Sequence, residues 1–169
     1  KDVQIILDKK NKKIDLNYFS NLGRSIIIDS KVNSWTITMN NLEKNRNEEF
    51  DNIYNLTGCL TLIDTVINET NIFGDNFKCE DTVNFIRVKG SINNVKFHKS
   101  GNDCLDFSYG IYEIKNGYFQ ECGDKSVSVG EKSLTTINNF IVENSNVGIA
   151  VKDSSVGNIN STLMNNLNL

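Results

Sequence analysis

The chain has 169 residues, a hydrophobic content of 38 % and a formal net charge of −3. This length and composition suit one domain with a core of its own. Lysine and arginine are spread among the acids, and the longest apolar runs are far shorter than the roughly 20 residues that span a bilayer. We therefore expect neither nucleic acid nor a membrane span among its interactions.

Short apolar runs recur along the chain and are separated by Asn, Gly, Asp and Ser, and proline is absent throughout. This pattern predicts strands at residues 4–7, 25–29 and 34–39, which form irregular first coils within 1–50, and a charged loop at 40–51. Regular coils are expected over 51–169, with a lateral loop at 68–77. No segment keeps a helical period for long, so helix should be scarce. The chain starts at Lys1 without Met or a signal peptide, which favours a mature product or an excised part of a longer chain.

A repeat appears when the stretch GNDCLDF, which starts at Gly101, is compared with the rest of the chain. Apolar residues recur at intervals of 22 in two columns, namely Val83, Leu105, Val127, Ile149 and Phe85, Phe107, Val129, Val151. A further column of isoleucines is followed two residues later by polar residues, among them Asn94, Asn116 and Asn139. We expect these asparagines to form a structural ladder that bonds from coil to coil.

Alternation within each run and a period of 22 between runs indicate strands stacked in register. The sequence therefore predicts an all-β fold, a right-handed parallel β-helix (solenoid) with coils of about 22 residues, in a single domain over residues 1–169.

The four cysteines form no CxxC pair and His98 is the only histidine, so we expect no metal site on them. They are expected to be buried small residues. Disulfides are compatible with this pattern, but sequence alone does not give their pairing.

Candidate catalytic residues are Asp81, Asp103 and Lys125, which occupy one position in three successive repeats. Adjacent strands lie about 4.8 Å apart, so the two carboxylates are expected to be neighbours that serve as acid and base. A lyase is a related model, in which carboxylates hold calcium and a basic residue abstracts a proton. We expect no cofactor otherwise. Solvated turn and face positions explain the same residues without catalysis.

Small and polar residues on the same predicted strands suggest a shallow groove for an extended sugar chain. Candidate substrate-binding residues are Asp106, Ser128 and Lys152, with Tyr109 as a stacking platform. Tyr112 and Tyr118 are further candidates for stacking, although packing in the core or at a turn is the commoner role of tyrosine. His98, beside Phe97, is expected to be a surface histidine.

The phrases GNDCLDFSYG, GDKSVSVGEKS and NVGIAVKDSS resemble parallel β-helix repeat regions of secreted or surface bacterial proteins, including those that accompany CotH-type kinase domains. Over residues 81–153 the chain also resembles, more loosely, the core of polygalacturonases. That resemblance implies catalytic positions at Asp81, Asn102, Asp103, Lys125, Ala150 and Lys152. The chain departs from the family there, since Asn102 replaces an aspartate, Lys125 a histidine and Ala150 an arginine.

Taken together, these patterns favour a non-catalytic module that binds carbohydrate or acts as a scaffold at the cell surface. The alternative is a polysaccharide-active hydrolase, lyase or epimerase. The expected partner is a polysaccharide or a neighbouring domain of a longer chain. By analogy with other β-helices, we expect a secreted or cell-surface location in a bacterium.

Overall fold

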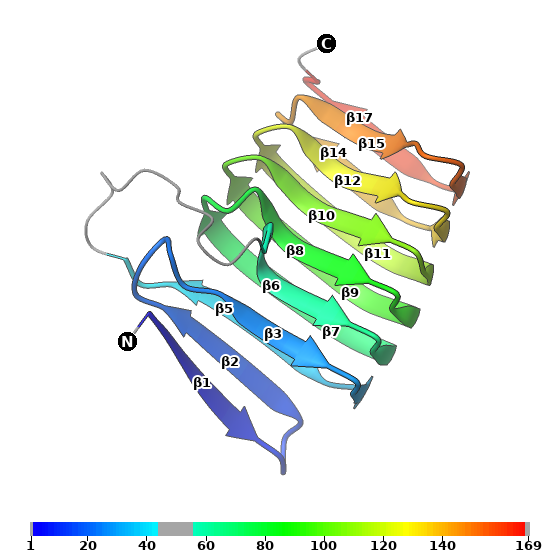
Figure 1. The fold of residues 1–169 in the computed structure, drawn as a ribbon. Coiled ribbons are helices and arrows are strands. Elements are labelled where there is room, and N and C mark those ends of the chain that lie inside the picture. The colour runs from blue at the N-terminus through cyan, green and yellow to red at the C-terminus, as the bar shows by residue number, and fades with distance from the viewer. Residues whose placement is uncertain (1, 44–55, 168–169) are drawn as a thin grey trace.

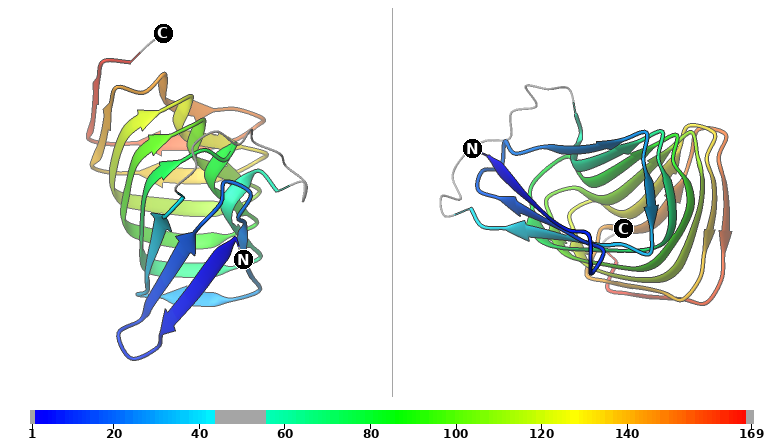
Figure 2. Two further views of the ribbon diagram at one scale, coloured as in Figure 1. Left: turned by 90° about the vertical axis from the view of Figure 1, so that its left-hand side faces the viewer. Right: turned by 90° about the horizontal axis from the view of Figure 1, so that it is seen from below.

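The computed structural model describes residues 2–43 and 56–167. In this part of the chain every regular element is a strand, and the coils stack along one axis so that their strands form parallel sheets (Figure 1). The exception is the N-terminal pair β1 and β2, which is antiparallel. Two further views show the N-terminal hairpin at one end of the stack and the last strands at the other (Figure 2). The predicted all-β parallel solenoid is confirmed.

Each coil contributes one strand to a first sheet, the short-strand sheet, and either one long strand or two shorter ones to a second, the long-strand sheet. The short-strand sheet contains β3 (Ser25–Ile28), β6 (Gly58–Ile63), β8 (Asp81–Ile86), β10 (Asp103–Ser108), β12 (Lys125–Gly130) and β15 (Val147–Val151). The long-strand sheet contains β1 (Val3–Asp8), β2 (Lys13–Tyr18), β4 (Lys31–Asn33), β5 (Thr36–Asn41), β7 (Val66–Phe77), β9 (Lys89–Ser100), β11 (Ile111–Cys122), β13 (Leu134–Ile137), β14 (Phe140–Glu143), β16 (Val156–Ile159) and β17 (Thr162–Asn165).

The register follows the repeat found in the sequence. In the short-strand sheet, Phe107 pairs with Phe85 on one side and Val129 on the other, at sequence offsets of 22 residues. These side chains are fully buried, and the rings of Phe85 and Phe107 stack with centroids 4.8 Å apart. Because each coil buries the same positions, the core runs continuously along the axis of the solenoid.

The coils turn at residues that adopt the left-handed backbone conformation at equivalent positions. One corner carries Asp64, Arg87, Tyr109 and Glu131, with φ between 50° and 58°, and the opposite corner carries Asn76, Lys99, Glu121 and Asn144, with φ between 53° and 61°. None of these residues is glycine, although this region costs an L-residue roughly 1–2 kcal/mol. The stacking of the coils therefore maintains a backbone shape that the individual residues disfavour.

The two loops expected from the sequence, at 68–77 and 40–51, differ from the structure where it describes them. The lateral loop predicted at 68–77 is wrong, because these residues belong to β7, which pairs with β5 and β9 along its length. The pairing of β7 with β9 is irregular between Ile67 and Asn71, but the offset between the two strands is 23 residues on both sides of this point. Of the predicted charged loop at 40–51, residues 40 and 41 end β5 and residues 44–51 lie outside the described part.

All four cysteines form disulfides on the inner side of the coils. Cys59 bonds to Cys79 and Cys104 to Cys122, with Cα atoms 5.5 and 5.8 Å apart. One coil earlier, the positions of Cys104 and Cys122 hold Thr82 and Ser100, whose hydroxyls form a hydrogen bond of 2.8 Å. The same corner is thus closed by a covalent bond in one coil and by a hydrogen bond in the next.

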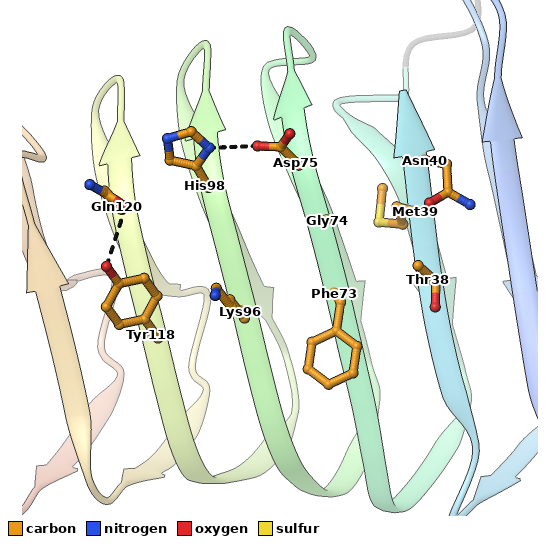
Figure 3. A pocket seen from close by; sticks show the side chains of 10 residues that line it. All are labelled: Thr38, Met39, Asn40, Phe73, Gly74, Asp75, Lys96, His98, Tyr118 and Gln120. Carbon is orange, nitrogen blue, oxygen red and sulfur yellow. Dashed lines mark hydrogen bonds and ion pairs between the residues drawn. The ribbon is translucent and has the colours of Figure 1, made fainter. Parts of the chain in front are cut away.

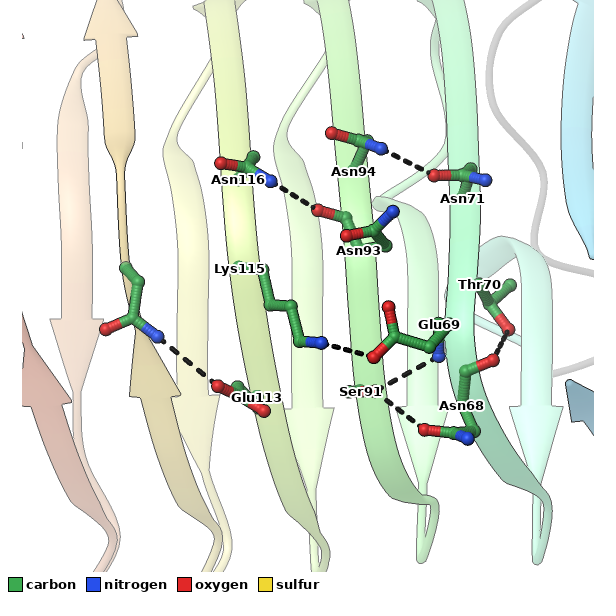
Figure 4. A network of polar contacts seen from close by, with 11 residues as sticks. Asn68, Glu69, Thr70, Asn71, Ser91, Asn93, Asn94, Glu113, Lys115 and Asn116 are labelled. Atoms are coloured by element: carbon green, nitrogen blue, oxygen red, sulfur yellow. Dashed lines mark hydrogen bonds and ion pairs between the residues drawn. The ribbon is translucent and has the colours of Figure 1, made fainter. Parts of the chain in front are cut away.

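The predicted asparagine ladder lies on the outside of the long-strand sheet (Figure 4). Asn94 donates to Asn71 Oδ1 at 2.7 Å and Asn139 donates to Asn116 Oδ1 at 3.2 Å. Between these pairs, Asn116 donates to the backbone oxygen of Asn93 at 3.0 Å. Asn94 and Asn116 are strand residues, and of the three predicted members only Asn139 has a positive φ, 47°.

Candidate functional site

The outer face of the short-strand sheet brings together the residues that the sequence singles out as catalytic. Asp81 and Asp103 pair directly across β8 and β10. The backbone N–H of Lys125, in the next coil, donates to Asp103 Oδ1 at 3.0 Å, and its Nζ lies 3.3 Å from the same oxygen. A second ion pair joins Lys125 to Asp124. The three candidate residues therefore form one column across three coils.

Asp106 lies on the same face although it is three residues from Asp103, because the strands are irregular at their second residue. A methyl group added at Gly58 would lie 2.8 Å from Thr61 Oγ1, so the first and fourth residues of β6 share a side. Thr61 aligns with Asn84, and Asn84 aligns with Asp106. Both intervening residues, Cys104 and Leu105, are fully buried, and a disulfide holds Cys104 on the inside of the coil.

Burial shifts the ionisation of all three carboxyl groups. Burial raises the pKa of Asp81 to about 7, and the charges of Asp106 and Asp103 add to this rise while a hydrogen bond from Thr57 opposes it. Burial also raises the pKa of Asp103, against the opposing effects of the Lys125 backbone and ammonium groups. The pKa of Asp106 also rises, first because of burial and then through the charge of Glu131, against the opposing charge of Lys152. Titratable groups shifted in this way are common at functional sites.

Among the buried polar atoms on this face that lack a hydrogen-bond partner, two lie at aligned positions of β6 and β8. Asn84 is 8 % exposed, and its amide nitrogen donates to Thr57 Oγ1 at 2.6 Å and to Asp81 Oδ2 at 3.3 Å. Its Oδ1 atom and the Oγ1 atom of the adjacent Thr61 have no partner within the described structure. Unpaired buried polar atoms are costly, so these two mark a place that a polar ligand or water would complete.

The predicted substrate-binding residues fall into two groups. Ser128 aligns with Asp106 in the next coil, and the charge of Lys152 acts on the Asp106 carboxyl group, so these two residues join the carboxylates. Tyr109 does not, because it lies in the corner after β10 and is 55 % exposed. It lines a separate cavity of about 420 Å³ together with Asp64, Arg87 and Lys89.

A second candidate site, which the sequence does not reveal, lies on the outer face of the long-strand sheet. A cavity of about 530 Å³ opens there across β5, β7, β9 and β11 (Figure 3). One row along its floor consists of Thr38, Phe73, Lys96 and Tyr118, which are aligned strand by strand. A parallel row, two residues further along each strand, consists of Asn40, Asp75, His98 and Gln120. We call this site the aromatic groove.

The two rows of the aromatic groove differ in chemistry. Phe73 and Tyr118 are half-buried and supply apolar ring faces. In the polar row, His98 Nδ1 lies 2.6 Å from Asp75 Oδ1, and His98 Nε2 lies 3.5 Å from Glu121 Oε1. The Tyr118 hydroxyl lies 2.8 Å from Glu143 Oε2 and 3.2 Å from Gln120 Oε1. Hydrogen bonding to Glu143 raises the pKa of the Tyr118 hydroxyl, so this hydroxyl remains protonated and uncharged at neutral pH.

His98 is a surface residue, as the sequence predicts, but its two carboxylate neighbours come from different coils and were not foreseen. Tyr118, a candidate stacking residue from the sequence, lies on an outer face and lines the aromatic groove. Neither face carries a metal-binding constellation, since the described residues contain no group of three or more His, Cys, Asp or Glu arranged to hold an ion.

Comparisons with protein-family models, curated proteins and solved structures gave no match. In residues 2–43 and 56–167 there is also no helix of the length and apolar character needed to cross a membrane. The fold places the chain among the β-solenoids.

Proposed function

We propose that the chain is a carbohydrate-binding β-solenoid module and that a polysaccharide lies in the aromatic groove. The observation that carries this proposal is the alignment of the two rows across four neighbouring strands. Sugar rings have apolar faces and polar rims, so they suit a surface that offers aromatic rings beside hydrogen-bonding side chains. The rows run along the axis of the solenoid, which is the direction an extended chain would follow.

The spacing of the aromatic residues supports a polymer over a single sugar. Phe73 and Tyr118 lie two strands apart, with Lys96 between them. At about 4.8 Å for each strand, the two rings are roughly 10 Å apart, and one small sugar does not cover both. The two disulfides favour an oxidising compartment, which fits a secreted or surface-exposed bacterial module of the type that accompanies CotH-like kinase domains.

Binding to a panel of soluble acidic and neutral polysaccharides, measured by titration calorimetry, tests this proposal. Tyr118→Ala should weaken binding about tenfold or more, which corresponds to roughly 1.4 kcal/mol, because it removes one platform. Tyr109→Ala is the matched control, since Tyr109 is an exposed tyrosine outside the groove and should leave affinity unchanged. Loss of binding in both variants, or in neither, would contradict the groove as the binding site.

A second candidate function is polysaccharide cleavage at the carboxylates of the short-strand sheet. The specific observation in its favour is that Asp81, with a pKa of about 7, lies beside Asp103, which is paired with Lys125. A carboxylic acid that is half protonated at neutral pH is suited to donate a proton to a leaving oxygen, while its ionised neighbour accepts one from water.

Product release from the same panel, followed by reducing ends and by unsaturated ends, tests the catalytic candidate. Turnover that disappears in Asp81→Asn and in Asp103→Asn, while binding persists, would establish an enzyme. Turnover retained in both variants would place any activity elsewhere. A binding module without activity should release no product and should bind both variants as tightly as the native chain, because these residues lie outside the aromatic groove.

A further inference from the structure

The charged residues of the aromatic groove are not equivalent. Asp75 is engaged by His98, and the bordering Glu121 and Glu143 lie near His98 and the Tyr118 hydroxyl respectively. Lys96 is different, because no carboxylate of the described structure lies within ion-pair distance of its ammonium group. Its one recorded contact is with the ring of Tyr118, whose centroid lies 5.2 Å from Nζ.

Other lysines on the outer surface do form ion pairs, so the fold itself does not prevent an outward-facing lysine from having a carboxylate partner. Lys115, on the same strand as Tyr118, forms an ion pair with Glu69 two coils away (Figure 4). Lys125, on the other sheet, is paired with Asp103 and Asp124. Lys96 is therefore a lining cation whose charge remains available to a ligand.

The position of Lys96 places this charge where a bound sugar chain would pass. It is exposed and lies between Phe73 and Tyr118 in one row, so chains stacked on both rings would cross its ammonium group (Figure 3). The aromatic ring on one side replaces part of the water around Lys96. A carboxylate that arrives there forms a charge-assisted hydrogen bond in a partly desolvated setting, which strengthens it.

We propose that the ligand of the aromatic groove is an acidic polysaccharide whose sugar carboxylates pair with Lys96, and that Lys96 determines the preference for acidic over neutral chains. This inference rests on the proposed carbohydrate-binding function. Stacking on Phe73 and Tyr118 supplies affinity for either kind of chain. The ion pair with Lys96 supplies the discrimination, because a neutral chain leaves the ammonium group with only the ring of Tyr118.

The test uses polygalacturonic acid and alginate, each compared with its fully esterified, uncharged form. The native protein should bind each acidic chain about tenfold more tightly than its ester, and the difference should shrink in 1 M salt. Lys96→Met keeps the aliphatic length of the side chain and removes its charge. It should abolish the preference for acid while changing affinity for the esters by less than twofold.

Lys115→Met is the matched control, because it removes a lysine that is already paired with Glu69 on the same sheet, and it should retain the preference. Equal binding of acid and ester by the native protein, with affinity still lost in Tyr118→Ala, would overturn this inference and leave the binding function intact. Binding of dextran sulfate as tight as that of polygalacturonate would also overturn it, since negative charge without a sugar carboxylate would then be sufficient for binding. No binding to any of the chains would overturn both proposals.

Discussion

The two outer faces of the solenoid share a backbone but differ in how charges are placed on it. On the long-strand sheet, the aligned row Asp75, His98 and Gln120 alternates acid, base and amide, so neighbours attract each other and remain exposed to solvent in part. On the short-strand sheet, Asp81 aligns with Asp103, so a carboxyl group lies over a carboxyl group. In a solenoid, residues at the same position of successive repeats lie side by side in neighbouring strands. When such a position carries the same charge in two repeats, the two side chains therefore repel each other.

Burial increases this difference. Asp81 and Asp103 are 7 % and 5 % exposed, whereas the side chains of His98 and Asp75 are 41 % and 70 % exposed. Charges in water are screened, while charges removed from water shift their proton equilibria. We therefore expect the short-strand face to control how stability depends on pH and the long-strand face to control ligand affinity.

The largest effect that would separate the faces is the pH dependence of unfolding. The pKa of Asp81 is raised in the folded protein to about 7, above its value near 4 in the unfolded chain. The folded state then binds more protons than the unfolded state between these values, so stability is highest at low pH and falls as pH rises through about 7. From pH 5 to pH 8 the loss due to Asp81 should be about 2 to 3 kcal/mol.

Urea unfolding at pH 5 to 8, with the disulfides intact, measures this loss. Asp81→Asn should remove the part of the dependence that is due to Asp81 and make the protein more stable than the native chain at pH 8. Asp64→Asn is the control, because hydrogen bonding to Arg87 lowers the pKa of the exposed Asp64, and its contribution changes only at more acidic pH. A native protein whose stability is constant over this range would show that Asp81 ionises normally.

Much of this contrast follows from sequence, and the part that does not has a physical cause. The column Asp81, Asp103 and Lys125 is visible because these residues lie in coils of constant period. The aromatic groove is hidden because Thr38 and Phe73, neighbours in the sheet, are separated by 35 residues across the long segment after β5. A search at a fixed offset of 22 therefore passes over the first strand of the groove.

Burial and pairing on the short-strand face were also beyond the sequence. Nothing in the order of residues shows that Cys104 turns inward beside Asp103, although this irregularity brings Asp103 and Asp106 to one side. The disulfide pairs follow from the same geometry, since Cys104 and Cys122 meet only because the coil closes at that corner. The repeat in the sequence shows which residues of successive coils lie side by side. Which residues of one coil approach each other depends on where the chain turns at the corners.

A smaller effect should distinguish the two lysines that face outward on the two sheets. Lys125 donates to a buried carboxylate, so Lys125→Met leaves Asp103 with fewer partners in a place that excludes water. We expect a loss of roughly 1 to 2 kcal/mol in the free energy of unfolding at pH 8, because a buried charged acceptor loses its counter-ion. Lys96→Met should stay within about 0.5 kcal/mol, as is usual for surface substitutions.

Chemical denaturation of both variants at pH 5 and pH 8 completes this comparison. At pH 5 the Asp103 carboxyl group, whose pKa burial raises, takes up a proton more readily in Lys125→Met and recovers part of the loss. A cost for Lys96→Met as large as that for Lys125→Met would mean that the long-strand face also relies on ion pairing for stability. The contrast between the faces would then not hold.

The smallest effect is expected at the corner that joins the two faces, where Arg87 and Asp64 form a two-fold ion pair with both contacts at 2.7 Å. Both side chains are about half exposed, so water and salt screen the pair and it should contribute little to stability. Arg87 also has a φ of 53°, a conformation that glycine adopts without steric cost. Arg87→Ala should therefore be less stable than Arg87→Gly by about 0.5 to 1 kcal/mol, the reverse of the usual order in a strand. Thermal unfolding of the native protein and of both variants in low salt and in 1 M salt separates the contributions, because salt weakens the ion pair of the native protein and leaves the backbone preference unchanged. If alanine proves as stable as glycine, the stacked coils do not hold residue 87 in a conformation that is costly for an L-residue, and the corner carries no backbone strain.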